Sequence, residues 1–296
     1  MLLESIVAVT LLVGDLDRTE RAYERTLDYR TVASGTLDAA HAEAWGAGAL
    51  EGRPYRLMQA ASGEPVYLRF IEAEGPPAPA LRHTGWNATE LLVEDPRELA
   101  RRLGGSPFTV IGRPEPLSMN PNVVAMQALG PDGELLYFTR IPAGQSKFAL
   151  GSATSFVDRV FIVVVGTQDL AETLAFYRSN FAAPTSEPAS ATVEILRRAW
   201  QLPEGHQFPF AVVRLPTRFL VEVDGYPAEA TAKPQAPGSL PMGMAMVSFV
   251  VSTLEPFRER LLAEPRVLEG PPYAGRRVGV LVGPSGERIE LIERAP

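Results

Sequence analysis

Four continuous apolar stretches, each followed by a helix-like pattern, set the predicted architecture. The stretches are rich in β-branched residues, which predicts buried strands at 6–13, 86–93, 160–165 and 244–251. A candidate N-cap with a glutamate three residues later follows each stretch, at Asp17, Asp95, Asp169 and Ser252. We therefore expect a helix after each of these strands.

Shorter apolar and alternating runs predict the remaining strands. They lie at 55–59, 66–72, 123–128, 134–140, 210–215, 219–223, 277–283 and 288–293. Residues 30–52 give no clear pattern apart from an Ala-rich piece around His41 and Trp45, which has helical spacing. The chain thus repeats four times the order of one strand, one helix and further strands. This repetition predicts four βαβββ modules.

An internal repeat supports this division. The turn and strand start Gly130-Pro131-Asp132-Gly133-Glu134 returns as Gly283-Pro284-Ser285-Gly286-Glu287, 153 residues later. Tyr23 and Tyr177, on the first and third predicted helices, lie 154 residues apart. Two modules therefore form each half of the chain.

A single βαβββ unit leaves one face of its sheet uncovered, so modules must pair to share a core. The Ala-, Gly- and Ser-rich residues 142–156 are the predicted boundary between halves. We expect an α+β protein with two cup-shaped mixed-sheet domains, residues 1–145 and 146–296. Inward-facing side chains would line each cup.

Composition narrows the classes of function. The 296 residues carry a net charge of −7 without a basic run, which argues against nucleic-acid binding. Cysteine is absent, which excludes disulfides and thiolate metal sites. Only three histidines are present, which argues against a His-rich metal site. No apolar run reaches the length of about 20 residues that spans a bilayer. The apolar opening has no basic residues before it, so we expect no signal peptide and a cytoplasmic protein. No cofactor motif is present, so we expect no cofactor. The sequence is compatible with a homodimer.

Several weak motifs recur in the same order and together resemble one known superfamily. They are residues 8–18 with Tyr23, residues 157–160 with 169–170 and 176–177, and the ending Gly286-Glu287-Arg288-Ile289-Glu290-Leu291. The chain is similar over essentially its whole length to the vicinal oxygen chelate superfamily. This superfamily includes glyoxalases, extradiol dioxygenases and fosfomycin-resistance proteins.

The resemblance implies a metal held by a His on the first strand of a module and a Glu on its last strand. Alignment by eye places Ala8, Ala88, Arg159 and Met246 at the first-strand positions. It places Arg69, Tyr137, Glu222 and Glu290 at the last-strand positions. Two glutamates match and no histidine does, so we expect no metal ligands.

In the expected C-terminal cup, Glu222, Glu290 and Arg159 would lie near one another. A carboxylate removed from water is a general base near neutral pH, and a guanidinium stabilises an enolate oxygen. These three residues are therefore the candidate catalytic set for proton abstraction beside a carbonyl. The alternative is that Arg159 forms a structural ion pair with one glutamate.

In the expected N-terminal cup, Arg69, Tyr137 and Glu90 are candidates for anchoring a carboxylate or phenolate. The alternative is a structural Arg–Glu pair across a collapsed cup. His206, before the strand that leads to Glu222, and Met246 complete the candidate substrate-binding residues.

These features favour a metal-independent lyase or isomerase acting on a small hydrophobic or aromatic carbonyl metabolite. One alternative is a non-catalytic protein that binds and sequesters such a ligand. A second is a metal-dependent dioxygenase or glyoxalase whose ligands lie outside the aligned positions.

Overall fold

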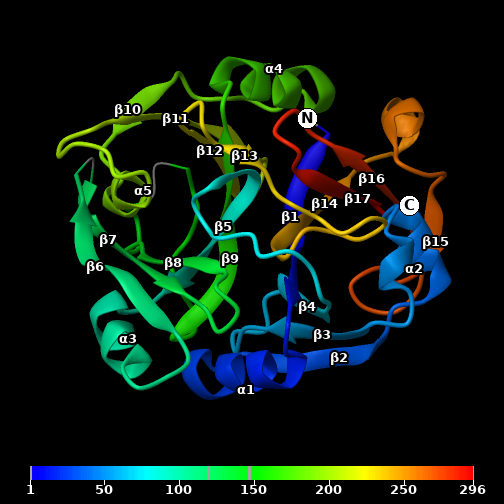
Figure 1. The fold of residues 1–296 in the computed structure, drawn as a ribbon, viewed down its shortest axis with the longest axis horizontal. Helices are drawn as coiled ribbons and strands as arrows, with labels where there is room; N and C mark the ends of the chain where they lie inside the picture. The colour runs from blue at the N-terminus through cyan, green and yellow to red at the C-terminus, as the bar shows by residue number, and fades with distance from the viewer. Residues whose placement is uncertain (1, 119, 146–147, 296) are drawn as a thin grey trace.

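The computed structural model describes residues 2–118, 120–145 and 148–295. Figure 1 shows the chain as two curled sheets side by side with helices around them. The first module comprises β1 (Leu3–Val13), α1 (Leu16–Leu27), β2 (Arg30–Thr36), α2 (Ala39–Ala44), a 3₁₀ helix η1 (Gly48–Leu50), β3 (Pro54–Gln59) and β4 (Tyr67–Glu72). The second comprises β5 (His83–Val93), α3 (Pro96–Leu103), β6 (Thr109–Leu117), β7 (Asn120–Leu129) and β8 (Leu135–Arg140).

The second half repeats this order. The third module comprises β9 (Val157–Thr167), α4 (Leu170–Phe181), β10 (Ala189–Ala191), α5 (Glu194–Ala199), β11 (Phe208–Arg214) and β12 (Leu220–Gly225). The linker that follows contains β13 (Thr231–Ala232). The fourth module comprises β14 (Gly243–Val251), a 3₁₀ helix η2 (Glu255–Arg260), β15 (Arg266–Leu268), β16 (Arg276–Val282) and β17 (Arg288–Glu293). The predicted α+β architecture of four modules is confirmed.

The helix starts follow the sequence signals in two of the four modules. Asp95 and Asp169 cap α3 and α4 through their side chains, as predicted. Helix α1 begins two residues early, because Asp15 rather than Asp17 accepts from the backbone N–H of Arg18. The capped α-helix expected from Ser252 is wrong. A 3₁₀ helix without a side-chain cap forms there instead, with a proline, which has no N–H to donate, at its start.

The two sheets pair modules that are not neighbours in the sequence. The first has eight strands in the order β15-β16-β17-β14-β1-β4-β3-β2, so it joins the first and fourth modules. The second has nine strands, with β10-β11-β12-β9-β5-β8-β7-β6 as its main path and β13 beside β5, and it joins the second and third modules. We call their concave sides the terminal cup and the central cup. In Figure 1 the central cup lies on the left and the terminal cup on the right.

The expected domains 1–145 and 146–296 therefore do not correspond to the two sheets, and residue 146 lies outside the described residues. Strand β1 pairs antiparallel with β14, and β5 pairs antiparallel with β9. The repeat relates the first module to the third and the second to the fourth, but it carries no information on which first strands meet. All four first strands are equally apolar, so their pattern fits either pairing.

Three clusters of buried side chains form the core. The largest contains residues of all four modules, among them Tyr23, Phe70, Phe138 and Phe249, and it joins the two sheets to the helices. A second cluster lies in the central cup and a third in the terminal cup. In the described part of the chain, no helix is long and apolar enough to cross a membrane.

Two tyrosine–glutamate pairs link the sheets at repeat-related positions. The hydroxyl of Tyr23 on α1 donates to Glu134 at 2.8 Å, and that of Tyr177 on α4 donates to Glu287 at 3.5 Å. Each glutamate also folds back over its own turn, where it accepts a backbone N–H two residues earlier. A Cβ on Gly130 would lie 1.9 Å from a Glu134 carboxylate oxygen, so this carboxylate requires a glycine beneath it. The repeated turn sequence is therefore fixed by a buried glutamate.

We expect Tyr23→Phe and Tyr177→Phe each to lower the free energy of unfolding by about 1–3 kcal/mol, because a buried carboxyl group loses a donor. Chemical denaturation measures this change. Tyr67→Phe is the matched control, because Tyr67 is half-buried and its hydroxyl makes no hydrogen bond among the described residues. Equal losses in all three variants would contradict a specific role of the two pairs.

Stability is also expected to fall as the pH rises from about 5 to about 7.5. Burial raises the pKa of Glu134 and of Glu287, each to about 7 from an ordinary 4.5. A carboxyl group with a raised folded-state pKa stabilises the fold below the unfolded pKa, and this contribution is lost as the pH rises through the folded pKa. The double variant E134Q/E287Q should therefore show a flatter dependence of the melting temperature on pH. An unchanged slope would contradict this assignment.

Candidate functional site

The central cup carries a cluster of three carboxyl groups. Glu90 projects from β5, whereas Glu222 and Asp224 project from the same face of β12 because they lie two residues apart. Strand β9 runs between these two strands and places Ile162 opposite Glu90 and Val164 beside Glu222. Both modules of the cup therefore contribute to the cluster.

The three groups share a strongly perturbed electrostatic environment. Burial, together with the charge of Glu222, raises the pKa of Glu90 to about 8. Burial also raises the pKa of Glu222, and it raises that of Asp224 well above its ordinary value of 3.8. Glu90 accepts a hydrogen bond of 2.5 Å from the Thr139 hydroxyl, and the charges of Glu222 and Glu90 add to the raised pKa of Asp224. Neighbouring carboxyl groups of this kind keep at least one proton at neutral pH.

Two tyrosines border the cluster. Tyr137 lies on β8, and Tyr226 follows directly after β12. Burial and the charge of Asp224 raise the pKa of both phenols well above 10. Both hydroxyls therefore remain protonated at neutral pH and are available as hydrogen-bond donors.

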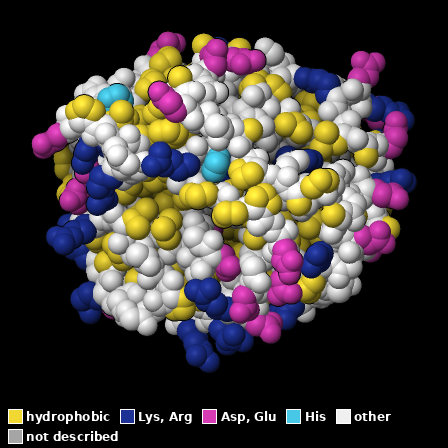
Figure 2. Space-filling view, in the orientation of Figure 1, with side chains coloured by type: hydrophobic (Ala, Val, Ile, Leu, Met, Phe, Trp, Pro, Cys, Tyr) yellow, Lys and Arg dark blue, Asp and Glu magenta, His cyan; other side chains and the backbone are white. Residues whose placement is uncertain are grey.

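Residual exposure distinguishes the two cups. In the central cup Ile162 is 7% exposed, Tyr137 is 9% exposed and Glu222 is half-buried. Met246 and Glu290, at comparable positions in the terminal cup, are 0% exposed. Figure 2 shows hydrophobic side chains on the left half of this face, where the central cup lies, and further ones across its middle and right. These positions on the floor of the central cup are therefore more exposed to solvent than their counterparts in the terminal cup.

The rest of the central cup is apolar. Its wall and the helix α5 across it contribute one cluster that includes Phe161, Phe208, Val212, Ile195 and Leu196. Carboxyl groups surrounded by such side chains are poorly solvated, which is the physical cause of their raised pKa values.

The terminal cup is closed by a hydrogen-bond network around Glu290. Its Oε1 accepts from the Trp45 indole N–H at 2.6 Å and from the Tyr273 hydroxyl at 2.8 Å. Its Oε2 accepts from the Ser248 hydroxyl and lies 3.6 Å from Nη1 of Arg69. Every donor comes from inside the cup, so Glu290 is fully engaged in structure.

Arg69 fills the remaining space of this cup. Its guanidinium lies 5.0 Å from the centre of the Trp45 ring and 5.2 Å from that of Tyr273, and Nη1 donates to the Thr10 hydroxyl at 3.3 Å. Arg69 is 2% exposed overall, and its Nη2 has no hydrogen-bond partner among the described residues. The expected Arg–Glu pair across a collapsed cup therefore exists, but its partner is Glu290 rather than Glu90.

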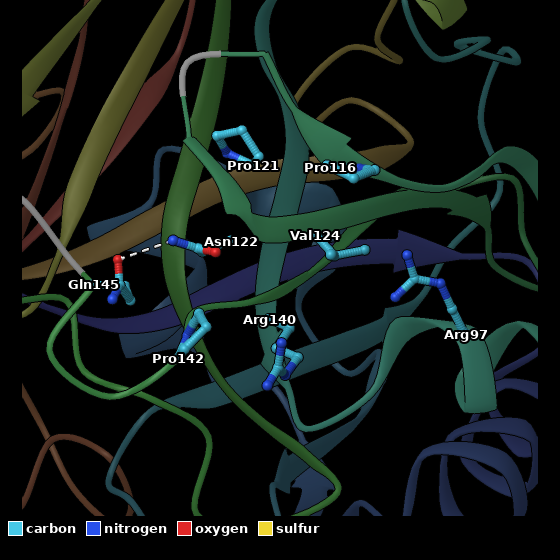
Figure 3. A pocket seen from close by; sticks show the side chains of 8 residues that line it. All are labelled: Arg97, Pro116, Pro121, Asn122, Val124, Arg140, Pro142 and Gln145. Carbon is cyan, nitrogen blue, oxygen red and sulfur yellow. Dashed lines mark hydrogen bonds between the residues drawn. The ribbon is translucent and has the colours of Figure 1, made fainter.

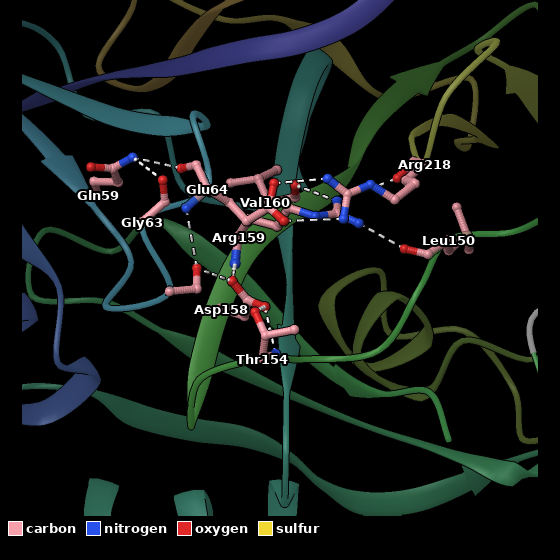
Figure 4. Close-up of polar contacts among 10 residues, drawn as sticks. Gln59, Gly63, Glu64, Leu150, Thr154, Asp158, Arg159, Val160 and Arg218 are labelled. Carbon is pink, nitrogen blue, oxygen red and sulfur yellow. Dashed lines mark hydrogen bonds and ion pairs between the residues drawn. The ribbon is translucent and has the colours of Figure 1, made fainter. Parts of the chain in front are cut away.

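The expected catalytic set of Glu222, Glu290 and Arg159 is wrong as a set. Glu222 lies in the central cup and Glu290 in the terminal cup, because β12 and β17 belong to different sheets. Figure 4 shows that the Arg159 guanidinium is bound by backbone carbonyls, those of Leu150, Val160 and Arg218. It makes no ion pair with either glutamate.

The register explains the misplacement of Arg159. Val164 lies beside Glu222, so the residue of β9 that corresponds to Ala88 of β5 is Ile162. The predicted position, Arg159, therefore lies three residues before the correct one. Burial lowers the pKa of Arg159 to about 10, so the guanidinium stays charged at neutral pH.

The remaining candidates separate as well. Glu90 and Tyr137 do meet in the central cup, whereas Arg69 and Met246 lie in the terminal cup. His206 is exposed before β11, with its ring against Phe208. Sequence reasoning missed Asp224 and Tyr226. The signal available was their spacing of two and four residues from Glu222, along β12 and just past its end, which favours one face for all three.

A surface hollow of about 390 Å³ lies on the α3 side of the second module. Figure 3 shows Arg97 from α3 and Arg140 from the end of β8 at its edge, with Asn122 hydrogen-bonded to Gln145. Val124, which lines this hollow, is on the opposite face of β7 from Val123 of the central cup. The hollow is therefore separate from the carboxyl cluster.

The side chains at the expected ligand positions do not suit a metal ion. With the corrected register, the central cup offers Ala88, Tyr137, Ile162 and Glu222, and the terminal cup offers Ala8, Arg69, Met246 and Glu290. Each set contains a single carboxylate, and a guanidinium repels a cation. Among the residues that the structure describes, no group of three or more His, Asp or Glu side chains is arranged to hold a metal ion.

Comparison with solved structures relates the fold to known proteins. Glyoxalase I from Zea mays superposes with a TM-score of 0.64 at 14% identity, over 97% of this chain and 92% of that chain. A putative dioxygenase from Bacillus subtilis gives a TM-score of 0.63 at 11% identity, over 99% of this chain and 86% of that chain. No family model and no curated protein sequence matches the chain. The protein therefore has the fold of the vicinal oxygen chelate superfamily, as the sequence motifs predict.

Proposed function

We propose that the central cup is the active site of a metal-independent lyase or isomerase. It would abstract a proton beside the carbonyl group of a small hydrophobic or aromatic metabolite. The observation that carries this proposal is the placement of Glu90 and Glu222. They reach the solvent-accessible floor of one apolar cup from two different modules, and both have raised pKa values.

Two coupled carboxyl groups that hold one proton provide both partners of an enolisation. The ionised group removes a proton from the carbon next to the carbonyl, and the protonated group or the Tyr137 hydroxyl donates to the carbonyl oxygen. Perturbed pKa values in a cleft are typical of such acid–base pairs. Asp224, two residues from Glu222 on the same face of β12, influences which carboxyl group holds the proton.

The lining of the cup indicates the class of ligand. Aromatic and aliphatic side chains such as Phe161 and Val212 favour a hydrophobic body. The carboxyl groups disfavour an anionic ligand, since like charges in an apolar cup repel strongly. An uncharged aryl ketone or aldehyde satisfies both conditions.

A binding protein without catalysis is the second candidate. The observation that favours it is helix α5, which packs Ile195 and Leu196 against the cup and would enclose a bound ligand. In this function the carboxyl groups would act only as hydrogen-bonding partners. The superfamily fold also hosts metal-dependent enzymes, and elemental analysis of the purified protein tests that alternative directly: a stoichiometric divalent ion would contradict metal independence.

Exchange of carbon-bound hydrogen with deuterated solvent separates catalysis from binding, because it reports proton abstraction even without net turnover. With phenylacetone as the first probe of an aryl-ketone panel, we expect the protein to accelerate exchange at the carbons beside the carbonyl. Glu222→Gln should lower this rate at least 100-fold, because the base is lost while the shape of the cup is kept. Proton NMR measures the exchange, and saturation-transfer NMR measures whether the ligand still binds.

Glu290→Gln is the matched control. Glu290 occupies the position equivalent to Glu222 in the closed terminal cup, so its substitution should leave exchange within about twofold of the unchanged protein, provided that the melting temperature stays above the assay temperature. Ligand binding without any accelerated exchange across the panel would favour the binding protein. Equal losses in both variants would contradict the assignment to the central cup.

The pH dependence of exchange tests the shared proton. The acid partner must keep its proton, and the pKa of Glu90 is raised to about 8. We therefore expect the rate catalysed by the protein, after subtraction of the rate in buffer, to fall as the pH rises above about 8. A catalysed rate that keeps rising with pH would show that no protonated carboxyl group takes part.

A further inference from the structure

The indole of Trp200 carries an unpartnered hydrogen-bond donor at the central cup. Trp200 directly follows α5, and its Nε1 is buried and has no hydrogen-bond partner among the described residues. The residue as a whole is half-buried, and its side chain packs against the apolar cluster of the central cup. The nitrogen edge of the ring is therefore turned towards the protein, while another part of the residue reaches solvent. A buried N–H group without an acceptor is rare and requires an explanation.

The internal repeat provides a matched tryptophan in the terminal cup. Trp45 and Trp200 lie 155 residues apart, and each is the C-cap of a six-residue helix, α2 or α5. In both, the backbone N–H of the tryptophan donates to the carbonyl four residues earlier. The residue that follows, Gly46 or Gln201, has a positive φ in each case. The same local structure therefore presents the two indoles to their cups.

The two cups differ in what the indole meets. In the terminal cup the Trp45 N–H donates to Glu290 at 2.6 Å. The residue of the central cup that corresponds to Glu290 in the repeat is Tyr137 on β8, 153 residues earlier. Tyr137 carries a phenol in place of the carboxylate, and it accepts no hydrogen bond from Trp200. Among the described residues, the central cup therefore has the donor of this pair and lacks its acceptor.

Neighbouring side chains hold the indole in place beside the carboxyl cluster. Its ring lies 6.5 Å from that of Tyr226, at an interplanar angle of 70°, and the guanidinium carbon of Arg82 lies 4.9 Å from its centre. Tyr226 borders the carboxyl cluster, because it lies just past the end of β12, two residues after Asp224. One aromatic ring therefore connects Trp200 to the groups that carry the proposed chemistry.

We propose that the Trp200 N–H binds the carbonyl oxygen of the uncharged aryl ketone or aldehyde in the central cup. This inference rests on the proposed function, which places that ligand beside Glu90 and Glu222. The carboxylate removes the proton, the C–H electron pair becomes the C=C bond, and the carbonyl π pair moves onto the oxygen that Trp200 binds. An indole N–H donates without giving up its proton, so Trp200 orients the carbonyl and stabilises the charge that develops on the oxygen.

NMR of the unchanged full-length protein tests this contact, because the chain has only three tryptophans. Trp45 and Trp86 donate to Glu290 and to the backbone carbonyl of Arg288, each at 2.6 Å, so their indole N–H groups are already engaged. A ¹H–¹⁵N correlation spectrum resolves the three signals, and through-space contacts to the Tyr226 ring assign that of Trp200. As phenylacetone is raised to its solubility limit, we expect the Trp200 signal to move downfield at least about three times as far as the other two.

A matched ligand and a matched variant complete the test. The hydrocarbon 2-methyl-3-phenylpropene has a CH₂ group in place of the carbonyl oxygen of phenylacetone, so it should leave the Trp200 signal without this downfield movement. Trp200→Phe should lower the exchange of phenylacetone catalysed by the protein at least about tenfold, because one donor to the developing charge is lost. Trp45→Phe removes the equivalent indole from the terminal cup. It should keep the exchange rate within about twofold at a temperature where the variant is folded.

The outcomes separate this inference from the proposed function. Accelerated exchange with an unmoved Trp200 signal overturns the inference and leaves the proposed function intact. A downfield movement of the signal without accelerated exchange of any ketone supports the inference and favours the binding protein. A signal that phenylacetone does not move, or that the hydrocarbon moves equally, overturns the inference in every case. Because these results come from the unchanged protein, they hold even if a variant does not fold.

Discussion

Antiparallel pairing between first strands decides which side chains of this protein face one another. Because β1 pairs with β14 and β5 with β9, the last strands β4 and β17 share one cup and β8 and β12 share the other. Arg69 therefore meets Glu290, and Tyr137 meets Glu222. Pairing of neighbouring modules would have exchanged these partners, with the same sequence and the same four modules. The chemistry of each cup therefore depends first on which strands pair, because strand pairing decides which side chains meet.

The two cups differ in whether a cation compensates their carboxyl groups. In the terminal cup a guanidinium and three neutral donors surround a single carboxylate, so the charge is compensated and the space is filled. In the central cup burial raises the pKa of Glu90, Glu222 and Asp224, and the charge of Glu222 raises that of Glu90 and Asp224 further, without a cation among the causes. A compensated pair fills its cup as part of the fold, whereas an uncompensated carboxyl cluster with raised pKa values can exchange protons near neutral pH.

The sequence predicted local features well and long-range pairing poorly. The four modules, the caps Asp95 and Asp169, and the repeated turn around Glu134 and Glu287 depend on neighbouring residues or on a strict repeat, and the structure confirms them. Which first strands meet depends on contacts between distant segments, and an apolar run carries no information on its partner. The prediction that Arg159 occupies the first-strand position is wrong for the same reason. Only the register with β12 identifies Ile162 as the inward residue.

The same distinction explains why we place the proposed function in the central cup. A buried carboxyl cluster without a counter-ion costs stability, and folds retain such clusters where the perturbed groups serve a purpose. The closed terminal cup, the three apolar clusters and the two tyrosine–glutamate pairs offset that cost elsewhere. Removing the cluster's charges should therefore stabilise the protein, whereas removing Glu290 should destabilise it, although both glutamates stand at equivalent places in their modules. Glu222 and Glu290 occupy the same position on the last strand of their modules, but their surroundings differ. Glu290 therefore supports the fold, whereas Glu222 is the proposed base.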